Sequence, residues 1–132
     1  MSRQDLTADM LTRIRNAVRN RAKTVQCLNS KLNYGVAEVL KQEGYINKFA
    51  VKDDGKQGVI DIDLKYGPRG EQVITSIKRV STCGRRVYSG VETLPVPLQG
   101  LGIAIVSTSR GILSDRRCRQ ERVGGEVVAI VT

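Results

Sequence analysis

The chain has 132 residues, of which 22 are Lys or Arg and 13 are Asp or Glu, and its formal charge is +9. A positive charge of this size indicates a polyanionic partner. The sequence contains no His, which excludes Ser-His, Cys-His and His-metal arrangements and argues against most enzyme chemistry.

Hydrophobic residues make up 40% of the chain, which is enough to fill the core of one domain or of two small ones in close contact. The longest largely apolar stretch, residues 100–106, is much shorter than the roughly 20 residues that a transmembrane helix requires. The first residues are charged and lead directly into a helical pattern, without the apolar segment of a secretory signal. We therefore expect a cytoplasmic protein without a membrane span.

Three cysteines, Cys27, Cys83 and Cys118, are widely spaced along the chain. An odd number of thiols without a CxxC pair fits neither a metal site nor a disulfide framework. Each cysteine is therefore predicted to be a small packing residue, and neither a metal nor a cofactor is expected.

Positive charge is concentrated in two parts of the sequence. Residues 1–31 and residues 66–132 each carry a net charge of +5, whereas residues 32–65 carry −1. Arg outnumbers Lys in both basic segments, and the guanidinium group matches the geometry of a phosphate better than an ammonium group does. This pattern favours two surfaces that contact nucleic acid over charge that is merely solvated.

The first half of the chain predicts the element order helix, strand, helix, strand, strand. Asp5 is an expected N-cap, followed by an apolar stripe at helical spacing: Leu6, Met10, Ile14, Ala17 and Val18. Residues 23–28 predict a short strand. Ser30 is the expected cap of a second helix that ends at Gly44, and residues 46–66 predict a hairpin in which Ile60, Ile62 and Leu64 alternate with polar residues.

The second half predicts mainly strands. A turn cluster at residues 66–70 is the expected boundary between an N-terminal domain, residues 1–66, and a C-terminal domain, residues 71–132. Strands are predicted at 73–80, 103–107 and 127–131, with a basic loop at 81–86 and a turn at 109–111. Ser114 is the expected cap of a short basic helix that continues to Glu121.

Two segments of this half carry candidate binding residues. Ser107, Thr108 and Ser109 follow a buried strand, where short hydroxyl side chains and backbone donors approach a phosphate or a base edge closely. From local chemistry alone a plain polar turn is the favoured interpretation. Tyr88 beside Arg85 and Arg86 places an aromatic ring among cations, which is typical of proteins that contact RNA, and the local pattern does not distinguish between the two arginines.

Five runs of the sequence resemble a known family: ADMLTRIRNA from Ala8, SKL from Ser30, RVSTCGRRVY from Arg79, GLGIAIVSTSRG from Gly100, and GGE from Gly124. Together they resemble bacterial ribosomal protein S-eight, the eighth protein of the small ribosomal subunit, and the resemblance covers the whole chain. It implies an α+β fold of two small packed units, an N-terminal αβαββ unit and a C-terminal β-rich unit with one short helix.

The same resemblance implies a non-catalytic, primary ribosomal-RNA-binding protein that recognises a stem in the central domain of the small-subunit RNA and supports subunit assembly. It implies contact with neighbouring small-subunit proteins, including the fifth, and some members of the family also bind messenger RNA that imitates the ribosomal site. The RNA-binding residues that it implies are Ser107, Thr108, Ser109, Gly124, Gly125 and Glu126, with Arg86 and Tyr88 on a basic aromatic strand and Ser30 and Lys31 in a second patch.

Two other classes of protein compete with this interpretation. An enzyme acting on nucleotides would need a general base that a chain without His does not supply. An RNA- or DNA-binding regulator outside the ribosome is the closer alternative. A DNA reader usually presents base-reading side chains near the start of a recognition helix, whereas the predicted C-terminal helix here is mostly Arg.

Overall fold

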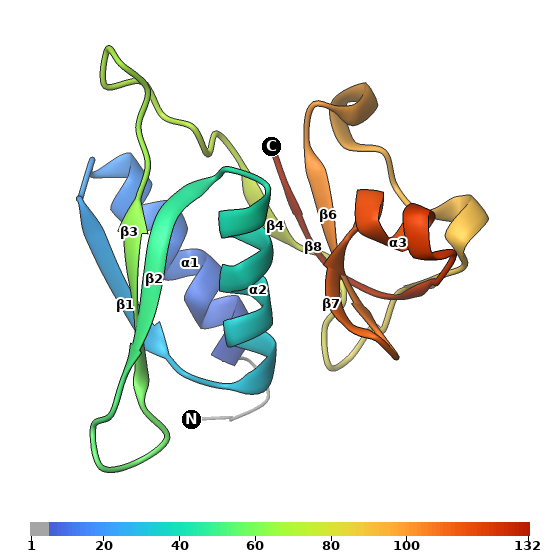
Figure 1. Cartoon of the computed structure of the whole chain (residues 1–132), viewed down its shortest axis with the longest axis horizontal. Helices are drawn as coiled ribbons and strands as arrows, with labels where there is room; N and C mark the ends of the chain where they lie inside the picture. The colour runs from blue at the N-terminus through green and yellow to red at the C-terminus, as the bar shows by residue number, and fades with distance from the viewer. Residues whose placement is uncertain (1–5) are drawn as a thin grey trace. The chain divides into compact units, whose positions relative to one another are not determined.

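The computed structural model describes residues 6–132, which form two compact units. The first unit ends at Thr75, and the second spans Ser76–Thr132 (Figure 1). The mixture of helices and strands in both units confirms the predicted α+β class. Asp5, the expected N-cap of the first helix, lies outside the described residues.

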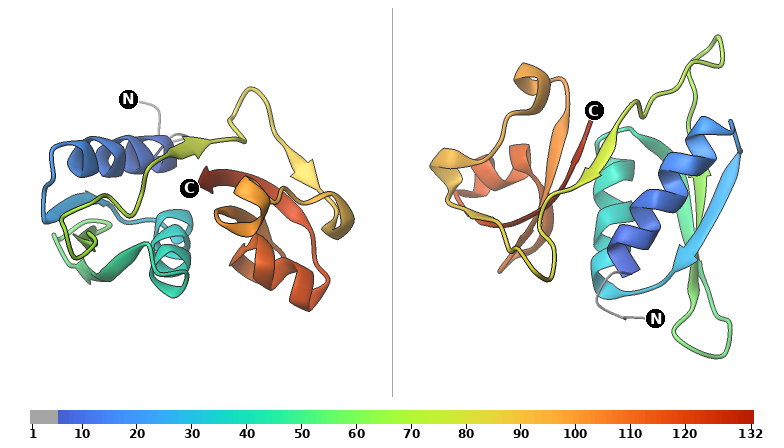
Figure 2. Two further views of the ribbon diagram at one scale, coloured as in Figure 1. Left: turned by 90° about the horizontal axis from the view of Figure 1, so that it is seen from above. Right: turned by 180° about the vertical axis from the view of Figure 1, so that it is seen from behind.

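The first unit contains α1 (Leu6–Arg19), β1 (Thr24–Leu28), α2 (Lys31–Gln42), β2 (Ile46–Lys52) and β3 (Val59–Leu64). This order confirms the predicted αβαββ arrangement. The three strands form an antiparallel sheet in the order β1-β3-β2. Seen from behind, α1 lies in front of these strands (Figure 2).

The core of the first unit follows the predicted periodicity. Met10, Ile14 and Val18 are buried on α1, as are Val36, Val39 and Leu40 on α2. On β3 the side chains of Ile60, Ile62 and Leu64 are buried, and those of Asp61 and Asp63 are half-buried on the other face of the sheet. The strand therefore has one apolar and one polar face, as its alternation predicts.

Residues 67–70, where the sequence suggests a boundary, form a turn within the first unit. The Gly67 amide donates to the carbonyl oxygen of Glu71 at 2.8 Å, and Tyr66 pairs with Gln72 in an antiparallel bridge. The chain continues through the buried Ile74 before the first unit ends.

The second unit contains β4 (Ile77–Arg79), β5 (Tyr88–Ser89), β6 (Ile103–Thr108), β7 (Gly111–Ser114), α3 (Asp115–Glu121) and β8 (Gly125–Val131). The last strand is central, because β6 pairs with one of its edges while β4 and β5 pair with the other. The predicted strand at 73–80 is shorter than expected, since its pairing with β8 begins only at Ile77.

One face of this second sheet packs against α3. Its buried cluster contains Leu94, Ala104, Val106, Cys118 and Val127. The Ser114 hydroxyl accepts a hydrogen bond from the Arg117 amide at 3.3 Å, which confirms Ser114 as the N-cap of α3. Asp115, also buried, accepts from the Ala104 amide at 3.0 Å and from Arg119, so the start of the helix is tied to β6.

The three cysteines do not share one environment. Cys27 and Cys118 are buried, as expected of packing residues, and burial raises the pKa of the Cys27 thiol to about 11. Cys83 is exposed, so the prediction that it packs is wrong. It lies in the basic loop between β4 and β5, where a local sequence pattern does not distinguish a buried thiol from an exposed one.

These environments predict selective thiol chemistry. In the folded chain a disulfide reagent at about pH 8 is expected to modify Cys83 rapidly and to leave Cys27 and Cys118 unmodified, because a thiol reacts as an accessible thiolate. Thiol titration before and after addition of denaturant measures this difference. Rapid modification of more than one thiol in the folded protein would contradict the structure.

Candidate nucleic-acid interface

Three predicted site residues form a row across neighbouring strands of the second unit. Glu126 on β8 lies opposite Tyr88 on β5 and, on its other side, opposite Ser107 on β6. Residues directly opposite one another share a face of the sheet. Because Val106 and Val127, the adjacent residues, face α3, the row lies on the face away from that helix.

Two glycines allow these strands to approach closely. A Cβ atom on Gly125 would lie 2.1 Å from the carbonyl oxygen of Ser107, and a Cβ atom on Gly124 would lie 2.3 Å from the carbonyl oxygen of Ser89. Both contacts are with backbone atoms, which have little freedom to move. The glycines therefore hold the row together, whatever contacts they make with a ligand.

The turn between β6 and β7 carries the predicted hydroxyl residues. The Thr108 hydroxyl donates to the carbonyl oxygen of Gly111 at 2.8 Å and accepts from the Arg110 amide at 3.0 Å. Its donor and one of its two acceptor positions are thus used inside the turn. Ser107 is half-buried and Ser109 is exposed, so the turn presents two hydroxyls on a fixed backbone.

Glu126 is the centre of a hydrogen-bonded network. Its Oε2 atom accepts from the Ser81 hydroxyl at 2.5 Å and from Arg86 Nη1 at 2.9 Å. The Ser81 oxygen in turn accepts from the Val87 amide at 3.1 Å. The network connects the basic loop to β8 and sets the position of Arg86 two residues before the Tyr88 ring.

Opposing effects act on the pKa of Glu126. Burial raises this pKa, but the hydrogen bonds from Ser81 and Arg86, together with the positive charges of Arg86 and Arg79, lower it further than burial raises it. The net pKa lies below the ordinary value, so Glu126 is ionised at neutral pH. The ionised carboxylate stabilises the fold fully at pH values above the pKa that Glu126 has in the unfolded chain. This stabilisation is lost as the pH falls through the lower pKa that Glu126 has in the folded chain.

Ser81 belongs to the candidate interface, although the sequence patterns did not indicate it. Only 1% of its surface is exposed, and its hydroxyl links the loop amide to the Glu126 carboxylate. Its position at the start of the basic loop, directly after the predicted strand, was the only local signal. Its partner is 45 residues away along the chain, so no spacing rule connects the two.

The structure places the remaining two predicted residues, Ser30 and Lys31, in the first unit. Ser30 is the N-cap of α2, as predicted, and its hydroxyl accepts from the Asn33 amide at 3.1 Å. The buried Asn33 side chain donates to the carbonyl oxygens of Leu6 and Leu28, which ties the start of α2 to α1 and β1. Lys31 is exposed beside this anchored cap.

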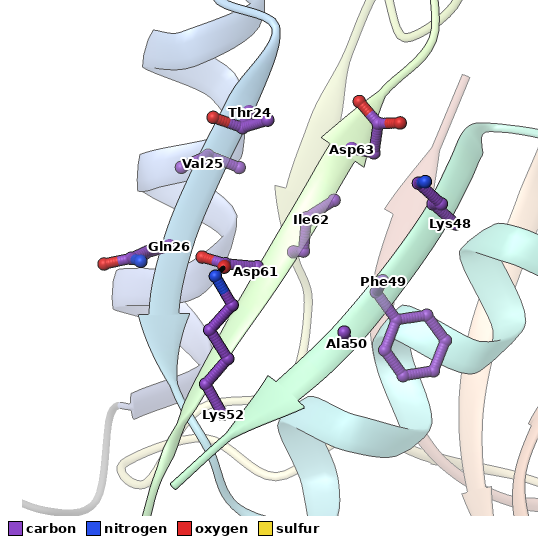
Figure 3. Close-up of a pocket in the computed structure, with 10 residues that line it drawn as sticks. All are labelled: Thr24, Val25, Gln26, Lys48, Phe49, Ala50, Lys52, Asp61, Ile62 and Asp63. Atoms are coloured by element: carbon purple, nitrogen blue, oxygen red, sulfur yellow. Dashed lines mark ion pairs between the residues drawn. The ribbon is translucent and has the colours of Figure 1, made fainter. Parts of the chain in front are cut away.

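A separate hollow of about 800 Å³ lies over the three-stranded sheet of the first unit. Figure 3 shows Lys52 reaching Asp61 across this surface, where their charged atoms are 2.5 Å apart. None of the predicted site residues lines the hollow. Among residues 6–132 no group of His, Cys, Asp and Glu side chains could hold a metal ion, and no helix is long and apolar enough to span a bilayer.

Comparison with known proteins identifies the family. The family model described as ribosomal protein S8 matches residues 5–132. Proteins named small ribosomal subunit protein uS8 from Caldicellulosiruptor bescii, Finegoldia magna and Streptococcus equi are each 53% identical over 127 residues. These matches cover 96% of this chain and 96%, 97% and 96% of the respective relatives. The chain therefore belongs to the ribosomal protein S8 family, and it is a non-enzymatic structural protein of the small ribosomal subunit.

Proposed function

We propose that the chain is a primary ribosomal-RNA-binding protein that recognises an irregular stem in the central domain of the small-subunit RNA and supports assembly of the subunit in the cytoplasm. The row of Tyr88, Glu126 and Ser107 carries this proposal. It combines an aromatic ring, a carboxylate that pairs with the Arg86 cation, and an uncommitted hydroxyl on one face of the sheet, and it lies beside the turn that carries Ser109.

In this mechanism, charge supplies affinity and geometry supplies selectivity. Arg86 uses one donor on Glu126 and keeps further guanidinium donors for phosphate oxygens. The Ser107 and Ser109 hydroxyls contact the RNA where its shape allows a close approach. Gly124 and Gly125 keep the neighbouring backbone free of side chains, and Tyr88, 70% exposed, offers its ring for stacking. Ser30 and Lys31 contact the RNA backbone as a second patch.

RNA affinity is expected to fall steeply with salt. Contacts with roughly 4–6 phosphates give a slope of about −3 to −5 in a plot of log affinity against log salt concentration. Titration of a central-domain transcript from about 0.05 to 0.3 M salt measures this slope. Arg86→Ala should reduce its magnitude by about 1, whereas Lys65→Ala, an exposed charge in the neutral middle segment, should leave it unchanged. A slope near zero in the parent would contradict the mechanism.

Messenger RNA that imitates the ribosomal stem would occupy the same surface, and the proposal includes such binding. A competition titration tests it. A messenger fragment with this stem should displace the central-domain transcript, and the Arg86→Ala substitution should weaken both complexes in parallel. A messenger complex that survives in the presence of saturating transcript would require a different surface.

The proposal also includes contact with neighbouring small-subunit proteins, the fifth among them. Val96, Leu98 and Leu101 are large apolar side chains of the second unit that are more than half exposed. The chain holds Leu98 at a φ of 48°, a strained conformation that presents this segment in one shape. Binding of the purified fifth protein to the parent and to Leu101→Ser tests this contact, which the substitution should weaken.

A further inference from the structure

The first unit contains a small hollow at the start of α2. It has a volume of about 370 Å³ and is lined by Asn29, Ser30, Lys31, Tyr34 and Gln57. We call it the Tyr34 hollow. Its volume lies at the lower end of the range of about 300–1,000 Å³ that is typical of sites for small organic groups. Two of its residues, Ser30 and Lys31, belong to the second patch of the proposed RNA-binding surface.

Tyr34 supplies an aromatic wall to this hollow. Its side chain is 42% exposed, and its ring meets that of Phe49 nearly at a right angle, with centroids 5.3 Å apart and planes at 80°. A T-shaped contact of this kind covers at most one face of the Tyr34 ring. The Tyr34 amide donates to the carbonyl oxygen of Ser30 at 2.8 Å, so the ring stands one helical turn beyond the cap.

Two other lining residues, Asn29 and Gln57, are held in place by reciprocal hydrogen bonds. Asn29 Nδ2 donates to the carbonyl oxygen of Gln57 at 3.2 Å, and Gln57 Nε2 donates to the carbonyl oxygen of Asn29 at 3.0 Å. The Asn29 amide also donates to the carbonyl oxygen of Gly58 at 3.0 Å. The loop between β2 and β3 is thereby tied to the start of α2, which keeps the hollow open against the Tyr34 ring.

The residues that line the Tyr34 hollow suit the base and the phosphate of a single nucleotide. The ring face suits a base, because every base has a flat surface that stacks on an aromatic side chain. Lys31 lines the hollow and is exposed, and its positive charge suits the phosphate attached to that nucleotide. A base in a regular duplex is already stacked on both sides, so only an unpaired base would fit.

We propose that the Tyr34 hollow binds one unpaired base of the RNA, stacked on the Tyr34 ring, with its phosphate at Lys31. The inference rests on the proposed RNA-binding function and extends its second patch from backbone contact to a base. The site thus selects RNA in which a stem is interrupted by an unpaired nucleotide.

A single-site fluorescent reporter tests the stacking. The chain contains no Trp, so the substitution Tyr34→Trp introduces one indole at the hollow, and Tyr88→Trp introduces one on the second unit as a matched reporter. A base stacked on the indole is expected to quench its emission when a central-domain transcript saturates the full chain. If Tyr88→Trp is quenched and Tyr34→Trp is not, the proposed function stands and this inference is wrong.

Affinity measurements separate the contribution of the Tyr34 ring to RNA binding from that of its hydroxyl. Tyr34→Leu is expected to weaken transcript binding roughly 5- to 150-fold, the value of one stacked base, whereas Tyr34→Phe should bind within about twofold of the parent. Melting curves of both variants identify any loss of folding. Equal losses in the Leu and Phe variants, or no loss in either, would overturn the stacking contact. If the parent chain does not bind the transcript, both the proposed function and this inference are wrong.

Discussion

A Gly125→Ala variant is expected to lose much of the stability of the second unit and, with it, RNA binding. The added Cβ would lie 2.1 Å from the carbonyl oxygen of Ser107 and 2.9 Å from its carbonyl carbon. Backbone atoms in a paired strand have little room to retreat, so β6 and β8 must separate where Ser107 faces Glu126. Overpacking costs about 1–3 kcal/mol and occasionally more, and contact with backbone atoms places this substitution at the upper end. Such a loss is a large share of the roughly 5–15 kcal/mol that stabilises a domain.

Thermal unfolding and transcript titration measure both effects. Gly90→Ala is the matched control, since a Cβ at that position meets nothing within 4 Å and the backbone there has an ordinary φ of −72°. It should unfold within about 0.5 kcal/mol of the parent. If Gly125→Ala unfolds and binds like the control, the strands are not held as closely as the structure shows.

Replacing both Ser107 and Ser109 by alanine is expected to reduce specific RNA binding strongly without unfolding the chain. Each hydroxyl contributes roughly 1–3 kcal/mol, because its loss leaves a desolvated RNA group without a partner. The substitutions remove one oxygen each from a half-buried and an exposed position, so they create no serious cavity. Thr108, whose hydroxyl closes the turn through Gly111 and Arg110, remains intact and preserves the backbone.

The loss should be selective for the ribosomal stem. Binding to an unrelated RNA duplex depends mainly on phosphate contacts and should change little. Parallel titrations of the two RNAs with the parent and the double variant give the selectivity ratio. Undiminished binding of the stem by the double variant would show that the turn is not the element that reads the RNA.

Much of the first unit was predictable from local sequence, because its elements have strong periodicity. The alternation of Ile60, Ile62 and Leu64 determines which face of β3 is buried, and this pattern lies within six residues. The caps of Ser30 and Ser114 were equally local, since each hydroxyl bonds an amide three residues later. Features that depend on neighbours in the sequence were therefore predicted well.

Features that depend on pairing between distant segments were not predicted from the sequence. The strand predicted at 73–80 begins only at Ile77, and this start is set by its partner β8, about 50 residues further along the chain. The exposure of Cys83 and the burial of Ser81 depend on how the loop between β4 and β5 lies against Glu126. Local patterns contain no information on such contacts.

The candidate interface shows both cases. The hydroxyl turn and the basic aromatic segment were visible as motifs, yet nothing in the motifs placed Tyr88, Glu126 and Ser107 in one row. Tyr34 could have been recognised as a candidate from its spacing, four residues after Ser30 on the same face of a helix. The structure adds that its ring is 42% exposed, which distinguishes it from a core aromatic.

Ultraviolet crosslinking of the full chain in cell lysate tests whether the protein recognises one ribosomal stem through the second unit. The attached RNA is sequenced and the attached peptides are mapped. The RNA crosslinks are expected to gather on one stem of the central domain of the small-subunit RNA, and the peptide crosslinks from the second unit are expected to include Tyr88 or residues 107–109. Crosslinks spread over many unrelated RNAs, or confined to peptides outside these segments and outside the second patch, would contradict this mode of recognition.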